Sequence, residues 1–192
     1  MSKKTFIAAA AIAAATLASA PAMAAEYAID PSHTFATFEM PHFGTSTNRG
    51  RFDKKEGKVM FDKAAKTGSV ELTIDMTSIN SGTAAFDKHL KSPDIFDAEA
   101  FPTATFKADK LVFNGDAVAE VPGMLTLKGK TQPVTLKANN FKCYDNPMLK
   151  REVCGGDFET TFDRTAFGVD YGLKYGVPKE VKVIVQVEAI KQ

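Results

Sequence analysis

The sequence predicts an all-β protein, an eight-stranded antiparallel β-barrel with a short helix in the long connection after the third strand. Apolar and polar residues alternate with a period of two along most of the chain, the pattern of strands with one buried face. The 13 glycines and 9 prolines are spread between the apolar runs, as expected of turns. Helical periodicity is limited to Ala84–Leu90 and a turn near Ala166–Tyr171. Closure of such a sheet into a barrel removes its exposed edges.

Eight alternating segments form the expected wall of the barrel. One face of each carries mainly Phe, Met, Leu, Ile and Val, and the other carries Lys, Glu, Thr and Asp. In water the apolar face must point inward. The expected strands are Thr34–Met40, Phe52–Phe61 with a bend near Lys55–Gly57, Val70–Met76, Ala104–Ala108, Val118–Leu127, Val134–Ala138, Phe158–Phe162 and Val181–Ala189.

The interior of an eight-stranded barrel is either filled by side chains or holds one small ligand. Small residues such as Ala36, Ala104 and Gly123 leave space on the expected inner wall, whereas Phe38 and Phe106 narrow it. Periodicity alone leaves a filled core and a cavity both open. An outer-membrane barrel, whose apolar face meets lipid, is a further alternative. Charged residues at the strand centres and the absence of Trp argue against it.

The first 24 residues have the pattern of a cleaved secretory signal peptide. Lys3 and Lys4 precede a short apolar run, Phe6–Leu17, and Ala22–Ala24 supplies small residues for cleavage before Ala25. The run is too short for a spanning helix, so an uncleaved anchor is the weaker alternative. We therefore expect two parts, the signal peptide 1–24 and a single barrel domain 25–192.

The charge balance argues against nucleic acid as a partner. The leader carries two of the 24 basic residues and no acidic ones, which leaves 22 basic residues against 23 acidic ones. A nearly neutral chain is not drawn to nucleic acid or to an anionic membrane surface.

Two cysteines, Cys143 and Cys154, are the only ones in the chain. An even count in an exported protein favours a disulfide, here across the turn at Asp145–Pro147 between the sixth and seventh strands. A metal or redox site would need more thiols or a CxxC spacing. We therefore expect a structural disulfide.

No catalytic pattern stands out, and we expect no catalytic residues, no cofactor and no metal. GxSxG, HExxH, GxGxxG and P-loop motifs are all missing. His33, His42 and His89 lack metal-ligand spacing, although they could still converge in space. The basic residues Lys88, Lys91, Arg49, Arg51 and Arg164 could bind an anionic head group. The ordinary alternative for them is a solvated rim.

The connection from Phe86 to Phe106 is long for a compact β domain, and such connections usually carry function. Its sequence, FDKHLKSPDIFDAEAFPTATF, closely resembles the signature of the YceI family of bacterial periplasmic polyisoprenoid-binding proteins. The resemblance extends over essentially all of the chain after the leader. Its other parts are Tyr27–Gly44 with Gly50-x-Phe52, the hairpin Gly123–Leu136, and Gly155–Phe158 followed by Arg164–Gly168.

The resemblance implies a lipocalin-like barrel with a long apolar pore that binds a polyisoprenoid or another long-chain amphiphilic lipid in the periplasm. It implies a carrier or store rather than an enzyme, with no stable membrane insertion. A homodimer is left open. The alternatives are an accessory protein that presents a quinone or prenyl carrier to a membrane redox partner, and a structural barrel that binds nothing.

The expected ligand-binding residues divide into a pore set and a mouth set. The pore set follows from the inward positions of the strands, and the mouth set from the long connection. Each of these residues could equally be ordinary core. The pore set is Phe38, Met40, Leu72, Ile74, Phe106, Leu125, Leu136, Phe162, Val183 and Val185, and the mouth or lid set is Phe86, His89, Leu90, Phe96 and Phe101.

Overall fold

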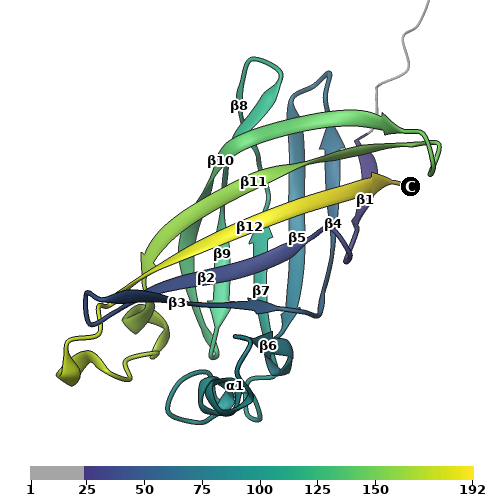
Figure 1. Ribbon diagram of the computed structural model, residues 1–192. Coiled ribbons are helices and arrows are strands. Elements are labelled where there is room, and N and C mark those ends of the chain that lie inside the picture. The colour runs from purple at the N-terminus through teal and green to yellow at the C-terminus, as the bar shows by residue number, and fades with distance from the viewer. Residues whose placement is uncertain (1–23) are drawn as a thin grey trace, which may run out of the picture.

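The computed structural model describes residues 24–192, so the expected signal peptide lies outside the described residues except for Ala24. Eight antiparallel strands form a closed barrel, in which β12 pairs with β11 on one side and returns to β1 on the other (Figure 1). The barrel strands in spatial order are β1 (Ala25–Ile29), β4 (Lys55–Asp62), β5 (Thr67–Asp75), β7 (Thr103–Ala108), β9 (Ala117–Leu127), β10 (Lys130–Asn146), β11 (Arg151–Asp163) and β12 (Glu180–Lys191).

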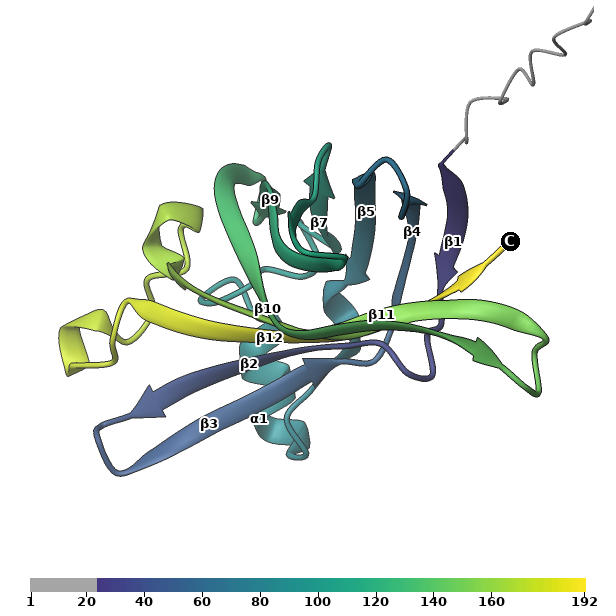
Figure 2. The same cartoon turned by 90° about the horizontal axis from the view of Figure 1, so that it is seen from above.

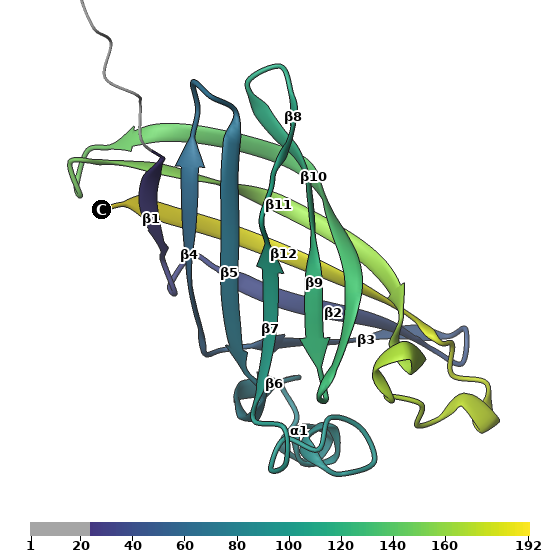
Figure 3. The same cartoon turned by 180° about the vertical axis from the view of Figure 1, so that it is seen from behind.

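A second set of strands branches from β12. The C-terminal residues of β12 pair with β1, whereas Lys182–Gln186 of the same strand pair with β2 (Phe35–His42). Strand β3 (Ser46–Phe52) pairs with β2 and then with the short β6 (Ile79–Asn80), so the sheet continues past β12 (Figure 2). On the other wall β4, β5, β7 and β9 run side by side, and β8 (Val112–Asn114) pairs with β9 (Figure 3).

The helical elements gather at one end of the barrel. The 3₁₀ turn η1 (Met76–Ser78) and helix α1 (Ala84–Lys91) lie on the connection from β5 to β7, and η2 (Arg164–Phe167) and η3 (Leu173–Tyr175) lie between β11 and β12 (Figure 1). Within residues 24–192, no helix combines the length and the apolar character that crossing a bilayer requires.

The predicted fold class and the helix after the third predicted strand are confirmed, but several details differ. The first predicted strand, Thr34–Met40, forms β2, which pairs with β12 and lies outside the closed ring of eight strands. The second predicted strand is split into β3 and β4, because Asp53 and Lys54 bond through their backbone N–H groups to Ser78 instead of to a strand. Strand β1 was missed because it is short. Strands β10 and β11 extend far beyond their predicted ends.

The long hairpin of β10 and β11 changes the setting of the disulfide. Cys143 and Cys154 are bonded, but they lie directly opposite each other within the two strands and not around the turn. The turn follows only after Asn146.

The outer face of the barrel carries charge at the strand centres. The carboxylate of Glu71 on β5 lies 3.7 Å from Lys58 on β4 and 3.9 Å from Lys107 on β7. Lys182 on β12 pairs with Glu159 on β11 at 2.8 Å. The polar residues of the alternating pattern therefore face outward, as the sequence predicts.

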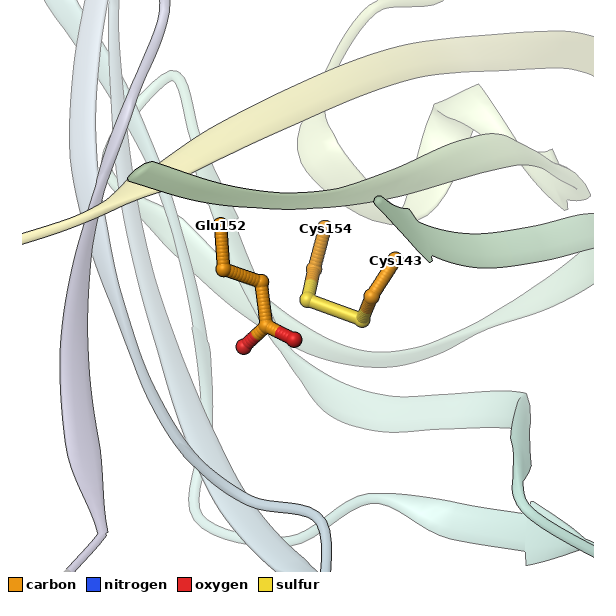
Figure 4. Close-up of side chains that lie close together, drawn as sticks. All are labelled: Cys143, Glu152 and Cys154. Carbon is orange, nitrogen blue, oxygen red and sulfur yellow. A yellow bond between two sulfur atoms is a disulfide. The ribbon is translucent and has the colours of Figure 1, made fainter. Parts of the chain in front are cut away.

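The inner face is closed by aromatic side chains at the end of the barrel away from α1. The buried ring of Phe61 stacks on Phe113 at 6.0 Å between ring centroids and meets Tyr27 and Phe141 edge-on at 6.1 and 5.7 Å. These four residues, from β1, β4, β8 and β10, are called the aromatic plug below. The disulfide lies beside Glu152 near the same end (Figure 4).

Candidate functional site

An apolar cavity of about 440 Å³ occupies the barrel between the aromatic plug and α1. Side chains from β2, β3, β5, β7, β9, β10, β11 and β12 form its wall, and no residue of the plug lines it. The volume lies within the range of small-molecule sites in proteins, about 300–1,000 Å³. The interior of this barrel is therefore hollow toward α1 and filled toward the plug.

The structure places the whole predicted pore set on the wall of this one cavity. Whether these side chains contact a ligand stays a prediction. The ten residues are Phe38, Met40, Leu72, Ile74, Phe106, Leu125, Leu136, Phe162, Val183 and Val185. Inward positions that the prediction did not include also line the cavity, among them Ala36, Phe52, Ala104, Val134 and Val181.

Two glycines allow large aromatic rings to lie against the wall. A Cβ atom added at Gly123 would stand 2.5 Å from Cζ of Phe106, and one added at Gly50 would stand 2.6 Å from Cε1 of Phe38. Any larger residue at either position would push the ring toward the centre of the barrel. The small residues of the sequence therefore create space indirectly, by accommodating rings.

Helix α1 forms one side of the cavity mouth. Its residues Phe86, His89 and Leu90 line the cavity together with Phe96 from the following loop. Phe101, the fifth member of the predicted mouth set, does not line it. The ring of Phe101 lies against the β9–β10 turn, where its Cε1 atom would stand 2.8 Å from a Cβ atom at Gly129. Phe101 is therefore placed outside the site.

The rest of the mouth is formed by two segments that the sequence did not predict to lie there. The tip of the β2–β3 hairpin supplies Pro41, His42 and Phe43, and the β11–β12 loop (residues 164–179) supplies Tyr171 and Tyr175. Phe43, Tyr171 and Tyr175 are exposed to solvent, at 55, 45 and 58%. Aromatic residues in predicted loops could have indicated a binding rim, but the sequence does not show that these loops meet at the same end of the barrel.

Contacts between loops hold the mouth in shape. The ring of His89 on α1 meets that of Tyr171 edge-on at 4.7 Å. The ammonium of Lys128, in the β9–β10 turn, donates hydrogen bonds to backbone carbonyls in both mouth loops. Its acceptors are Pro93 and Ile95, at 3.1 and 3.0 Å, in the α1–β7 loop (residues 92–102), and Gly168, at 3.4 Å, in the β11–β12 loop.

The basic residues noted in the sequence separate into three places. Lys88 and Lys91 face a wide surface hollow beside α1, whose wall also includes Asp94 and Glu99 and shares His89 with the cavity. Arg49 and Arg51 lie on the outer surface, where their Nε atoms pair with Glu39 at 2.6 Å and with Asp53 at 2.8 Å. Arg164 alone among them lines the cavity.

The three histidines do not form one cluster. His33, in the turn between β1 and β2, pairs with Asp30 at 2.8 Å, whereas His42 and His89 line the cavity mouth. In the part of the chain that the structure describes, the one group with metal-ligand spacing is Cys143, Glu152 and Cys154 (Figure 4). Its two sulfur atoms are bonded to each other and offer no thiolate. Glu152 accepts hydrogen bonds from Tyr27 at 2.6 Å and Lys63 at 2.8 Å.

Comparison with known proteins agrees with this architecture. The model of the YceI-like domain matches residues 27–189. The chain belongs to the YceI-like family. A UPF0312 protein of Pseudomonas aeruginosa (strain LESB58) is 36% identical over the full length of both chains. A UPF0312 protein of Vibrio cholerae is 39% identical over 66% of this chain and 68% of its own.

Two solved structures share the fold. The crystal structure of Burkholderia cenocepacia BcnA superposes with a TM-score of 0.68, at 26% identity over 83% of this chain and 98% of BcnA. A domain from Saccharophagus degradans, described as a polyisoprenoid binding domain implicated in plant cell wall breakdown, superposes with a TM-score of 0.62. That domain is 14% identical over 89% of this chain and all of its own length, so the likeness is one of fold.

Proposed function

We propose that this YceI-like protein binds a polyisoprenoid or another long-chain amphiphilic lipid, with the tail in the barrel cavity. The observation that carries the proposal is the apolar cavity of about 440 Å³, which is lined by α1 at its mouth and ends where the barrel is filled toward the aromatic plug. The polyisoprenoid binding domain from Saccharophagus degradans, which has the same fold, supports the same ligand class.

Burial of the tail would supply the affinity. Each methylene group removed from water contributes about 0.8 kcal/mol, so about ten of them contribute roughly 8 kcal/mol before the cost of association. The polar head would lie at the mouth end of the cavity. No covalent step is needed, and we propose no enzymatic activity and no cofactor beyond the bound lipid.

We further propose that the protein works in the periplasm as a carrier or store. The leader at residues 1–24 has the pattern of an export signal, and the disulfide suits an oxidising compartment. A lipid with a long tail is poorly soluble in water, so an aqueous compartment needs a protein that shields it.

Native mass spectrometry of the protein purified from its own periplasm, followed by extraction of any bound molecule, tests the proposal. We expect an isoprenoid or long-chain adduct at one per chain. A protein that carries no lipid, and takes up none when isoprenoids are offered, would contradict it. Near-ultraviolet absorbance of the extract then identifies a quinone, as the redox-accessory alternative requires.

Two neighbouring residues on β9 provide a matched control. Leu125 lines the cavity, whereas Met124 is exposed at 45% on the outer face. Leu125→Asp places a carboxylate against the lipid tail and should remove the adduct, and Met124→Asp should retain it. Both variants are first checked for folding by circular dichroism. Equal retention of lipid would mean that the tail does not occupy this cavity.

A further inference from the structure

Arg164 is a buried cation on the wall of a largely apolar cavity. It begins η2 directly after β11 and is 5% exposed. Two of its three guanidinium nitrogens serve the local fold. Nε donates to the carbonyl of Pro178 at 3.0 Å, and Nη1 donates to that of Val169 at 2.7 Å. These bonds fix the base of the β11–β12 loop, which forms part of the mouth.

The third nitrogen, Nη2, is different. It is buried and has no hydrogen-bond partner anywhere in residues 24–192. It is also the only buried side-chain nitrogen or oxygen in that part of the chain with none. Buried polar groups in proteins are almost always hydrogen-bonded, and an exception calls for a physical reason.

The charge of Arg164 also lacks a direct counter-ion. Within residues 24–192, no carboxylate oxygen lies within ion-pair distance of it. The preceding residue, Asp163, is committed elsewhere, because it accepts two hydrogen bonds from Thr165 and pairs with Lys179 at 3.3 Å. Burial lowers the pKa of the Arg164 guanidinium, and the more distant charges of Asp170 and Asp163 partly oppose this effect.

We propose that Nη2 of Arg164 binds an anionic oxygen on the head of the lipid, so that the cavity selects an amphiphile with a carboxylate or phosphate over a neutral one with the same tail. This inference rests on the proposed lipid-binding function. An arginine hydrogen bond to an anion is short and strong, and it would supply both the missing acceptor and the missing counter-charge.

The location of Arg164 suits a head group. Its backbone belongs to the β11–β12 loop, whose residues Tyr171 and Tyr175 form the rim of the mouth. From there the cavity continues along Phe162 and Phe106 toward the aromatic plug, with mostly apolar side chains around it. A lipid with its anion at Arg164 would place its tail along this apolar path.

A series of ligands with one tail tests the inference on the wild-type protein. Farnesyl phosphate, farnesoic acid, farnesol and the hydrocarbon farnesene are compared by displacement of the neutral fluorescent probe N-phenyl-1-naphthylamine. We expect the phosphate or the acid to bind about tenfold to a hundredfold more tightly than the alcohol. The better of the two anions identifies the head-group class. Equal affinity for anions and alcohol would overturn the inference.

Arg164→Gln then identifies the residue responsible. This variant should lose the preference for the anions while farnesene binds as before. Arg51→Gln, which removes an exposed arginine outside the cavity, should change neither. Equal weakening of all four ligands in Arg164→Gln would indicate a structural role and contradict the inference. If that variant does not fold, Arg164→Lys keeps the charge and should retain part of the preference.

The two proposals fail in different ways. If none of the four ligands displaces the probe, the lipid-binding function itself is wrong. If farnesene and farnesol bind but the anions gain nothing, the function stands and only the role of Arg164 is refuted.

Discussion

Filling the cavity from one wall residue should weaken lipid binding without weakening the fold. Ala104 on β7 is buried and lines the cavity. Ala104→Leu adds three carbon atoms, which would take the place of about three methylene groups of the tail. At about 0.8 kcal/mol each, the loss is about 2.4 kcal/mol, or roughly 50-fold in Kd.

The stability of the lipid-free Ala104→Leu variant should not fall, in contrast to its affinity for lipid. Because the added atoms enter existing space, they bury apolar surface without displacing neighbours. The free energy of unfolding in urea should therefore stay constant or rise slightly, whereas additions to a filled core cost about 1–3 kcal/mol.

Ala108 provides the control on the same strand. It is as buried as Ala104 and faces the same way, but it packs opposite Val70 and does not line the cavity. Ala108→Leu should therefore lower the free energy of unfolding by about 1–3 kcal/mol and leave the intrinsic affinity of the folded protein unchanged.

Kd values come from probe displacement and unfolding free energies from urea titration of lipid-free protein. The reasoning is refuted if Ala104→Leu destabilises the protein as much as Ala108→Leu and binds lipid as tightly as the wild type. That result would mean that the space beside Ala104 is filled.

Three further predictions concern stability. Joint replacement of Cys143 and Cys154 by serine should lower the free energy of unfolding by about 2–3 kcal/mol, since the bond spans a separation of 11 residues, and reductant should have a similar effect on the wild type in urea titrations. Lys128→Met should lower the free energy of unfolding by about 1–2 kcal/mol and speed amide hydrogen exchange in both mouth loops. Unchanged exchange in those loops would contradict this prediction. His33→Gln should remove a pH-dependent contribution to stability. Bonding and charge from Asp30 raise the pKa of His33 above 6.5, so the contribution is complete below that value and declines as the pH rises through the raised pKa. Burial alone would raise the pKa of Asp30, but hydrogen bonds led by that of His33 lower it to about 2, so its share is present above 3.8 and is lost as the pH falls toward 2. The wild-type-minus-variant difference should therefore be largest between pH 3.8 and 6.5 and decline on both sides, and a difference that is the same at every pH would contradict this account.

The sequence predicted the wall of the cavity well because its signal is local. Inward residues alternate with outward ones along each strand, so Leu72 and Ile74, or Val183 and Val185, fall on one face whatever the exact pairing. Periodicity could not decide between a hollow and a filled interior. That outcome depends on ring positions, such as Phe106 over Gly123, which only the packed barrel defines.

The mouth was harder to predict because its parts are distant in the chain. Phe43, at a hairpin tip, and Tyr171, between two 3₁₀ turns, reach the same cavity as α1 only after the barrel closes. Phe101 shares its segment with Phe96, but its ring lies against Gly129 and does not line the cavity, a difference in direction that the sequence pattern does not contain. The sequence included Arg164 among five basic residues that could bind an anionic head group, but it could not single this residue out, because an unpartnered nitrogen is a property of three-dimensional packing.

The filled end of the barrel, on the side of the aromatic plug, gives the cavity a floor. A lipid held here can enter and leave only beside α1, tail first on the way in and head first on the way out. Loading and unloading would then use the same face of the molecule, so a lipid donor and a lipid acceptor could not occupy it at the same time. The depth from mouth to floor also limits the tail length that can be shielded, and any excess would trail into water. The side chains that fill the barrel between the cavity and the aromatic plug would therefore set the longest chain that the protein can shield completely.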